Sequence, residues 1–400
     1  MRDLLPDEME RVRAVEDAFA SACRQWGYRE IRTPVIEPLY LFTSAGTLSP
    51  QTLDRVYSFL DWDGWSGERV VLRPDSTIPA ARLYSERLDD GRVAKLFYSQ
   101  NVFRFTDEGS REEWQCGVEL IGDTGARGDV ELVLLALEAL RPLKLPEVTV
   151  RLSHAGIVRA VLAAAGMTAD EQSAAYDRLL DGDMSVVDEV EARVPQLNAT
   201  LRMLFEIEGA GSGYIANLRG PLTETIPSLA PAIDDLAFIV AALEAHGVSP
   251  SIKAVLARSF EYYSGLVMRF EIDGKRIVTG GRYDELIGLV GGTQVPASGF
   301  ALYVSPLIEM LPAQPHAASG RRIVVQAAGG GPALLAAAHA AAQRLRDAGL
   351  HAEAVEGMHT VPTHHLLCRA ESPAFTLEWQ HASEKFERLD DVVAALTESR

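Results

Sequence analysis

The segment from Leu266 to Ile272 alternates apolar and charged side chains, which is the pattern of a β-strand with one buried face. Asp273 and Gly274 follow it, and this dipeptide accepts the positive φ angles of a tight hairpin turn. The run Arg276–Thr279 then predicts the return strand, with the glycine-rich stretch Gly280–Asp284 at its end. An isolated hairpin is marginally stable, so these residues favour a larger antiparallel sheet that covers the apolar face.

Other segments extend this expectation along the first three quarters of the chain. Strand-like runs are expected at Ile31–Glu37, Val70–Leu72, Lys95–Ser99 and Gln115–Ile121, and helices at Pro6–Trp26 and Asp129–Leu140. Strands with so few βαβ spacings predict an α+β fold, in which helices flank an antiparallel sheet. From about residue 155 to 250 apolar residues recur at helical spacing, which predicts a helical insertion.

A breaker-rich stretch, Pro312–Gly320, predicts a domain boundary. Beyond it the sequence predicts a strand at Ile323–Ala327, a glycine turn, an alanine-rich helix and a strand near Ala352–Val355. The turn lacks the spacing of a dinucleotide-binding or P-loop motif, which favours a plain connection. We therefore expect a core of residues 1–311 and a small α/β domain of residues 320–400.

Composition restricts the classes of function. A length of 400 residues predicts two or three domains, and the formal charge of −18 opposes binding to a polyanion such as tRNA. No apolar run reaches the roughly 20 residues of a membrane span, and the N-terminus lacks a signal-peptide pattern, so a cytoplasmic protein is expected. Three widely spaced cysteines form neither a disulfide framework nor a metal-ligand pattern, and we expect no metal and no cofactor.

Five stretches, in order, resemble sequence motifs of histidyl-tRNA synthetase, a class II aminoacyl-tRNA synthetase. They are Gly27–Glu37, Leu72–Thr77, Val102–Gly122, Arg258–Gly265 and Thr279–Asp284. The resemblance implies the class II fold, with an antiparallel sheet, flanking helices, the helical insertion and a truncated anticodon-binding-like C-terminal domain. It also implies that the first stretch builds a dimer interface around its proline.

The same resemblance implies a histidine-binding site. Its residues would be Asp75, Thr77, Arg104, Gln115, Glu119, Arg258, Tyr262, Tyr263 and Tyr283. Asp75 would bind the ammonium group, Arg104 the carboxylate, and Glu119 an imidazole N–H. The alternative is that the charged residues form ordinary surface ion pairs and that the tyrosines are core and rim packing of a strand pair.

Three departures from the synthetase pattern argue against adenylation chemistry. Pro306 stands where the synthetases carry the arginine that grips the ATP γ-phosphate. The loop between Arg104 and Arg111 is about three residues shorter than in the enzymes, and Asp75 replaces their glutamate. In these features the chain is similar to the regulatory subunit of ATP phosphoribosyltransferase, a paralogue of the synthetase.

That similarity implies a regulatory subunit and no catalytic residues. It implies L-histidine as the bound effector and a short-form catalytic ATP phosphoribosyltransferase as the partner, with self-association as a dimer within a hetero-octamer and no tRNA. Histidyl-tRNA synthetase is the alternative, and a histidine-binding paralogue of other function is a third possibility. The C-terminal domain, which many such regulatory subunits lack, keeps the synthetase alternative open.

Overall fold

The computed structural model describes residues 3–44, 56–62, 67–105, 111–123, 125–256, 262–312, 322–354, 364–379 and 382–398. The chain divides into two compact units, Met1–Pro312 and Ala313–Arg400.

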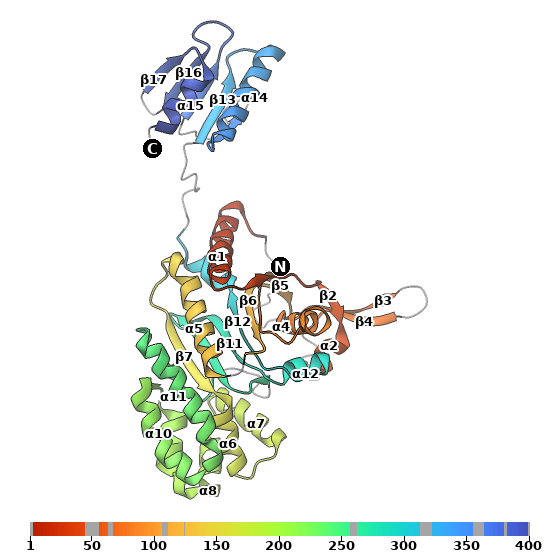
Figure 1. Cartoon of the computed structure of the whole chain (residues 1–400), viewed down its shortest axis with the longest axis vertical. Coiled ribbons are helices and arrows are strands. Elements are labelled where there is room, and N and C mark those ends of the chain that lie inside the picture. The colour runs from red at the N-terminus through yellow and green to blue at the C-terminus, as the bar shows by residue number, and fades with distance from the viewer. Residues whose placement is uncertain are drawn as a thin grey trace. The chain divides into compact units, whose positions relative to one another are not determined.

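A nine-stranded sheet forms the centre of the first unit, in the order β1-β5-β6-β12-β11-β10-β7-β9-β8 (Figure 1). Its strands are β1 (Arg29–Glu30), β5 (Ala94–Phe103), β6 (Glu112–Ile121), β7 (Thr149–His154), β8 (Gly209–Ala210), β9 (Ser251–Ile252), β10 (Leu266–Ile272), β11 (Lys275–Arg282) and β12 (Ala297–Tyr303). The predicted antiparallel arrangement is confirmed for β5 through β7, while the short strands β1 and β9 pair in parallel with β5 and β7.

The hairpin between β10 and β11 has the predicted turn. Asp273 and Gly274 have φ angles of 49° and 76°, the left-handed region that this turn requires. The return strand is longer than predicted, because β11 continues through Gly280 and Gly281 to Arg282. The two glycines therefore lie within the sheet, where Gly281 pairs with Gly299 of β12.

Helices cover both faces of this sheet. On one face, α1 (Pro6–Gln25), α5 (Ala126–Leu140) and α13 (Val304–Met310) pack into the largest apolar core. On the other face, α2 (Leu39–Ser44), α4 (Thr77–Leu83) and α12 (Leu286–Gly291) surround a second core. The predicted helices at Pro6–Trp26 and Asp129–Leu140 are thus confirmed, the second beginning three residues earlier.

The predicted helical insertion is present beside the end of the sheet formed by β7, β9 and β8 (Figure 1). Its helices are α6 (Ala155–Ala164), α7 (Ala169–Leu180), α8 (Ser185–Arg193), α9 (Asn198–Glu206), α10 (Gly211–Thr225) and α11 (Ala230–Ala245). They share the large core with the sheet, and α11 packs against both α5 and β7. The insertion is therefore continuous with the body of the unit.

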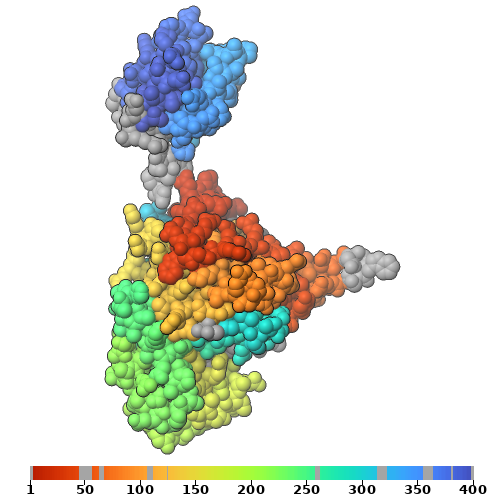
Figure 2. All heavy atoms as spheres, in the orientation of Figure 1, coloured from red at the N-terminus to blue at the C-terminus, as the bar shows by residue number. Residues whose placement is uncertain are grey.

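The prediction of one strand at Ile31–Glu37 is wrong. The chain leaves the large sheet after Glu30, crosses through Thr33 and Pro34, and begins β2 (Ile36–Pro38) in a separate sheet, β2-β4-β3. β3 (Ser58–Trp62) and β4 (Gly67–Leu72) complete that sheet, which projects as an arm (Figures 1 and 2). Proline cannot donate to a ladder, which fits its place at the crossing.

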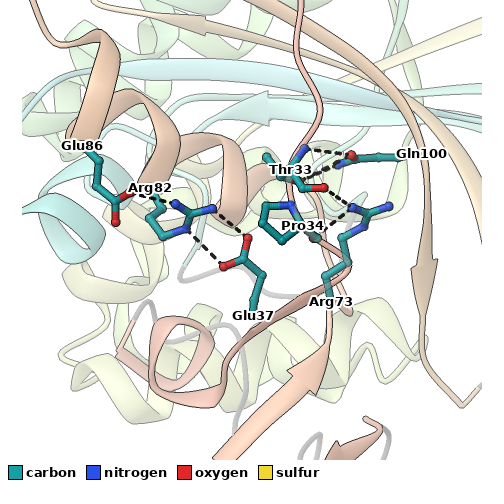
Figure 3. Close-up of polar contacts among 7 residues, drawn as sticks. All are labelled: Thr33, Pro34, Glu37, Arg73, Arg82, Glu86 and Gln100. Carbon is teal, nitrogen blue, oxygen red and sulfur yellow. Dashed lines mark hydrogen bonds and ion pairs between the residues drawn. The ribbon is translucent and has the colours of Figure 1, made fainter. Parts of the chain in front are cut away.

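Buried Arg73 holds this crossing in place. Its Nη1 donates to the carbonyl oxygens of Thr33 and Pro34 at 2.8 and 3.0 Å, and its Nε donates to that of Asn101 at 2.7 Å. Beside it, Arg82 of α4 contacts Glu37 at 2.8 Å and Glu86 at 2.9 Å (Figure 3). These contacts tie the crossing segment to β5 and α4, both of which lead into the candidate site.

The C-terminal unit is a five-stranded mixed sheet in the order β14-β13-β15-β16-β17. Its strands are β13 (Arg322–Ala327), β14 (His351–Ala354), β15 (His364–Cys368), β16 (Phe375–Trp379) and β17 (Ala382–Phe386). The helices α14 (Pro332–Asp347) and α15 (Leu389–Glu398) pack on the sheet in one apolar core. The strands β13 and β14 and the helix α14 agree with the sequence-based prediction, whereas β15 to β17 and α15 were not predicted.

Candidate functional site

The candidate site lies on the sheet face that α4 and α12 cover. Glu119 of β6 pairs with Leu96 of β5 and with Gly299 of β12, so it stands near the middle of the sheet. Gly117 and Gln115 precede it on the same face of β6. Glu119 is only 2% exposed, and most of the other residues of its strand are apolar.

Two tyrosine hydroxyls hold the Glu119 carboxyl group. Tyr98 Oη donates to Glu119 Oε1 at 2.9 Å, and Tyr283 Oη donates to Oε2. Burial raises the pKa of Glu119 to about 8; the hydroxyls of Tyr283, Tyr98 and Thr77 oppose this rise, and nearby Asp75 adds to it. The carboxyl group is therefore fixed in position and poised to change its charge near neutral pH.

Glycines make room for these side chains. A Cβ at Gly117 would collide with the Tyr98 ring, and one at Gly299 would collide with the Glu119 carboxyl group and the Tyr283 hydroxyl. The site is thus shaped by positions that lack a side chain. A glycine inside an otherwise apolar strand is a sequence signal of such close approach.

The turn Arg73–Thr77 brings a second carboxyl group to the site. Asp75 Oδ1 accepts a hydrogen bond from the backbone N–H of Ile78 at 2.9 Å, at the start of α4. Burial raises the pKa of Asp75, while the Ile78 N–H and the positive charge of Arg104 lower it. Asp75 lies near enough to Glu119 to raise the pKa of the Glu119 carboxyl group, and two carboxyl groups placed this closely favour a cationic ligand.

Three tyrosines form an aromatic wall. The ring of Tyr262 lies 5.2 Å, centroid to centroid, from the rings of both Tyr263 and Tyr283. Tyr263 is edge-on to Tyr262 at 90°, and Tyr283 is tilted at 34°. Aromatic faces of this kind suit a flat, partly cationic ring.

Arg104 and Gln115 lie at the other end of the site and share one acceptor. Arg104 Nη2 and Gln115 Nε2 donate to Glu113 Oε2 at 3.1 and 3.2 Å. Glu113 therefore holds one nitrogen of the guanidinium group that a ligand carboxylate would use. Arg258, also expected in the site, lies outside the described residues.

Eight of the nine expected residues can thus be located. Seven of them are linked by direct contacts or electrostatic influence, and the eighth, Gln115, joins them through Glu113. Sequence reasoning missed Tyr98 and Glu113. Tyr98 resembles a core residue of a strand. The only signal in the sequence was the glycine at position 117, which the structure pairs opposite Tyr98. Glu113 adjoins the predicted motif residues but has no distinguishing spacing of its own.

Pro306, the position that departs from the synthetases, lies inside α13. This helix has the sequence VSPLIEM and contains no lysine or arginine. Within the described residues there is no group of three or more His, Cys, Asp or Glu side chains placed to hold a metal ion. None of the helices formed by the described residues is both long and apolar enough to cross a membrane.

Comparison with known proteins adds three findings. The histidyl-tRNA synthetase family model matches residues 1–307. An ATP phosphoribosyltransferase regulatory subunit from Dehalococcoides mccartyi is 48% identical over 314 residues, which cover 78% of this chain and 76% of that protein. A histidine–tRNA ligase from Methanosarcina acetivorans is 33% identical over 336 residues, covering 81% and 77%.

A solved structure supports the fold. The Bacillus halodurans protein described as an ATP phosphoribosyltransferase regulatory subunit/histidyl-tRNA synthetase superposes with a TM-score of 0.77. It is 24% identical, and the match covers 93% of this chain and 97% of that one. The predicted class II, histidyl-tRNA synthetase-like fold is therefore confirmed.

Proposed function

The chain belongs to the histidyl-tRNA synthetase-like family of ATP phosphoribosyltransferase regulatory subunits, and on this premise we propose that it binds L-histidine and thereby feedback-regulates a catalytic partner. The relatives are named regulatory subunits of ATP phosphoribosyltransferase, and these names support a regulatory role in histidine biosynthesis. The partner is a catalytic ATP phosphoribosyltransferase, and we propose its short form, which this chain activates in the first step of the pathway.

The observation that carries the histidine proposal is the buried Glu119 between two tyrosine hydroxyls. An imidazole N–H needs a fixed acceptor, and Glu119 is held by Tyr98 and Tyr283 beside the aromatic wall. Asp75 supplies a carboxyl group for the ligand ammonium. Arg104 would bind the ligand carboxylate once it exchanges Glu113 for the ligand.

Regulation by histidine requires two states of the assembly with different histidine affinities, because an effector shifts an equilibrium only through differential binding. A regulatory subunit needs the amino-acid pocket and has no use for an ATP γ-phosphate contact. The absence of a cationic side chain from α13, where Pro306 lies, fits that requirement. Losing one charge-stabilising contact typically costs a reaction about 10²-fold or more in rate.

The alternative function is histidine activation and tRNA charging. It is favoured by the 33% identity to a histidine–tRNA ligase and by the presence of a C-terminal unit. Residues 320–400 of that unit carry 8 basic and 10 acidic side chains, which is a poor balance for binding an anticodon.

One experiment separates the two. Histidine binding to the purified full chain is measured by calorimetry, and histidine-dependent ATP–pyrophosphate exchange is measured in parallel. We expect binding without exchange. Exchange at the rate of a synthetase would establish the ligase, and no histidine binding would refute the proposed sensor.

We also propose self-association as a dimer within a hetero-octamer. The support is the arm formed by β2, β3 and β4, which exposes large apolar side chains. The exposed apolar residues are Val35 just before β2, Ile36, Phe59, Leu60 and Trp62 on the arm, and Tyr40 on the adjoining helix α2. Each is 40 to 67% exposed. Exposed apolar clusters of this kind mark interaction surfaces.

A further inference from the structure

The helical insertion reaches the aromatic wall of the site through a partly buried ion-pair network. Arg282, the residue before Tyr283, places Nη2 at 2.6 Å from Asp129 Oδ2 of α5. Its Nη1 lies 3.1 Å from Asp235 Oδ2 of α11, in the insertion. One guanidinium group thus joins the core of the unit, the insertion and the strand that carries Tyr283.

The network is shielded from solvent. The side chains of Arg282, Asp129 and Asp235 are 13, 1 and 27% exposed. Salt and water screen such charges much less than surface pairs, so loss of one partner is felt by the others. Gly265 leaves room for the Arg282 side chain, since a Cβ at that position would lie 2.9 Å from the Arg282 Cδ.

A second contact joins the insertion to the wall. Arg159 of α6 donates from Nη2 to the carbonyl oxygen of Tyr263 at 3.0 Å. The start of α6 is tied to the same segment, because the N–H of Ala155 donates to the carbonyl of Gly265 at 2.9 Å. Ser264 lies between Tyr263 and Gly265, and its N–H donates to the carbonyl oxygen of Arg282 at 2.9 Å.

From these contacts we infer that the helical insertion sets the affinity of the site for histidine, with Asp235 and Arg159 as positioning residues that act through Arg282 and Tyr263. The inference rests on the proposed histidine site. Binding free energies are reciprocal, so histidine must in turn stabilise the position of α6 and α11. Binding of histidine then changes the position of the insertion, and that change reaches the surface of the molecule.

The test compares two adjacent aspartates of α11. Asp235→Asn removes the charge that faces Arg282, while Arg282 keeps Asp129 as its partner. Asp234→Asn is the matched control, because Asp234 pairs with Arg219 on the surface, where both side chains are about half exposed. In the full chain we expect Asp235→Asn to weaken histidine binding by about 3- to 10-fold, and Asp234→Asn to leave it unchanged.

A second variant and a second measurement exclude a purely structural role. Arg159→Met should weaken histidine binding in the same direction. Histidine should also slow amide hydrogen exchange in α6 and α11 of the wild type, and less so in Asp235→Asn.

The outcomes are distinguishable. A wild type that does not bind histidine refutes the proposed function itself. Wild-type binding with equal affinity in Asp235→Asn and Arg159→Met overturns the inference alone, even if both variants unfold at lower denaturant.

Discussion

At the scale of single residues, Glu119 has the most unusual environment of the candidate site. Its pKa of about 8 in the folded protein compares with an ordinary value of 4.5, and burial is the main cause. Between these two pH values the folded protein holds a proton that the unfolded chain has released. The resulting contribution to stability is fully present below pH 4.5 and is lost as the pH rises through 8.

We therefore expect the free energy of unfolding to fall between about pH 5 and pH 8, by at most roughly 1 kcal/mol per pH unit from this group alone. Glu119→Gln keeps the shape and removes the titration. Urea unfolding of both proteins at several pH values in this range isolates the contribution, because other titrating groups are shared. Parallel pH profiles for wild type and variant would show that Glu119 keeps an ordinary pKa.

At the scale of secondary-structure elements, Arg73 joins three segments. It is 2% exposed and donates to the crossing at Thr33–Pro34, to the Asn101 carbonyl and to the Asn101 side chain. It also begins the turn that presents Asp75. The path of the chain from the large sheet to β2 thus depends on one guanidinium group (Figure 3), and so does the position of Asp75, a proposed binding residue.

Arg73→Met should lower the free energy of unfolding by roughly 3 kcal/mol or more, since it leaves several buried acceptors without a donor. Arg69→Met on β4 is the control. Arg69 is exposed and contacts Ser58, so its loss should change stability by no more than about 0.5 kcal/mol. Equal denaturation midpoints for the two variants would show that Arg73 does not stabilise the crossing segment.

The elements also show what the sequence could and could not predict. The hairpin at Asp273–Gly274 and the helix α1 were predictable because their signals are local. The crossing at Thr33–Pro34 was misread as one strand because its carbonyl partners are supplied by Arg73, about 40 residues away. The site residues, proposed from a resemblance, gained contacts that no local pattern encodes, such as the bond from Tyr98 to Glu119.

At the scale of the whole molecule, the arm formed by β2, β3 and β4 is the surface that we most expect to contact another protein chain. Leu60 and Trp62 share one face of β3, while Phe59 lies on the other face, as does Ile36 on β2 by the pairing through β4. Apolar side chains therefore emerge on both sides of a thin sheet. β2 begins directly after the crossing segment that Arg73 holds. The arm is therefore connected through Arg73 to the turn that brings Asp75 to the candidate site.

Trp62→Glu should shift the purified chain from dimer towards monomer, because it would place a charge in the proposed contact. Sedimentation velocity over a range of concentrations measures this shift. Phe238→Glu on α11 is the matched control, since Phe238 is 48% exposed and lies in the insertion. A wild type that is monomeric at all concentrations would refute self-association through the arm.

The glycines at positions 117 and 299 have a consequence for evolution and for inhibitor design. Where a pocket is bounded by side chains, a bulkier ligand can be admitted by a change of rotamer. Here the Tyr98 ring and the Glu119 carboxyl group rest directly against the backbone of neighbouring strands. In the proposed histidine site these two side chains therefore cannot move back to admit a bulkier ligand, because the backbone at Gly117 and Gly299 lies directly behind them. The upper limit on ligand size at this point is set by the sheet itself.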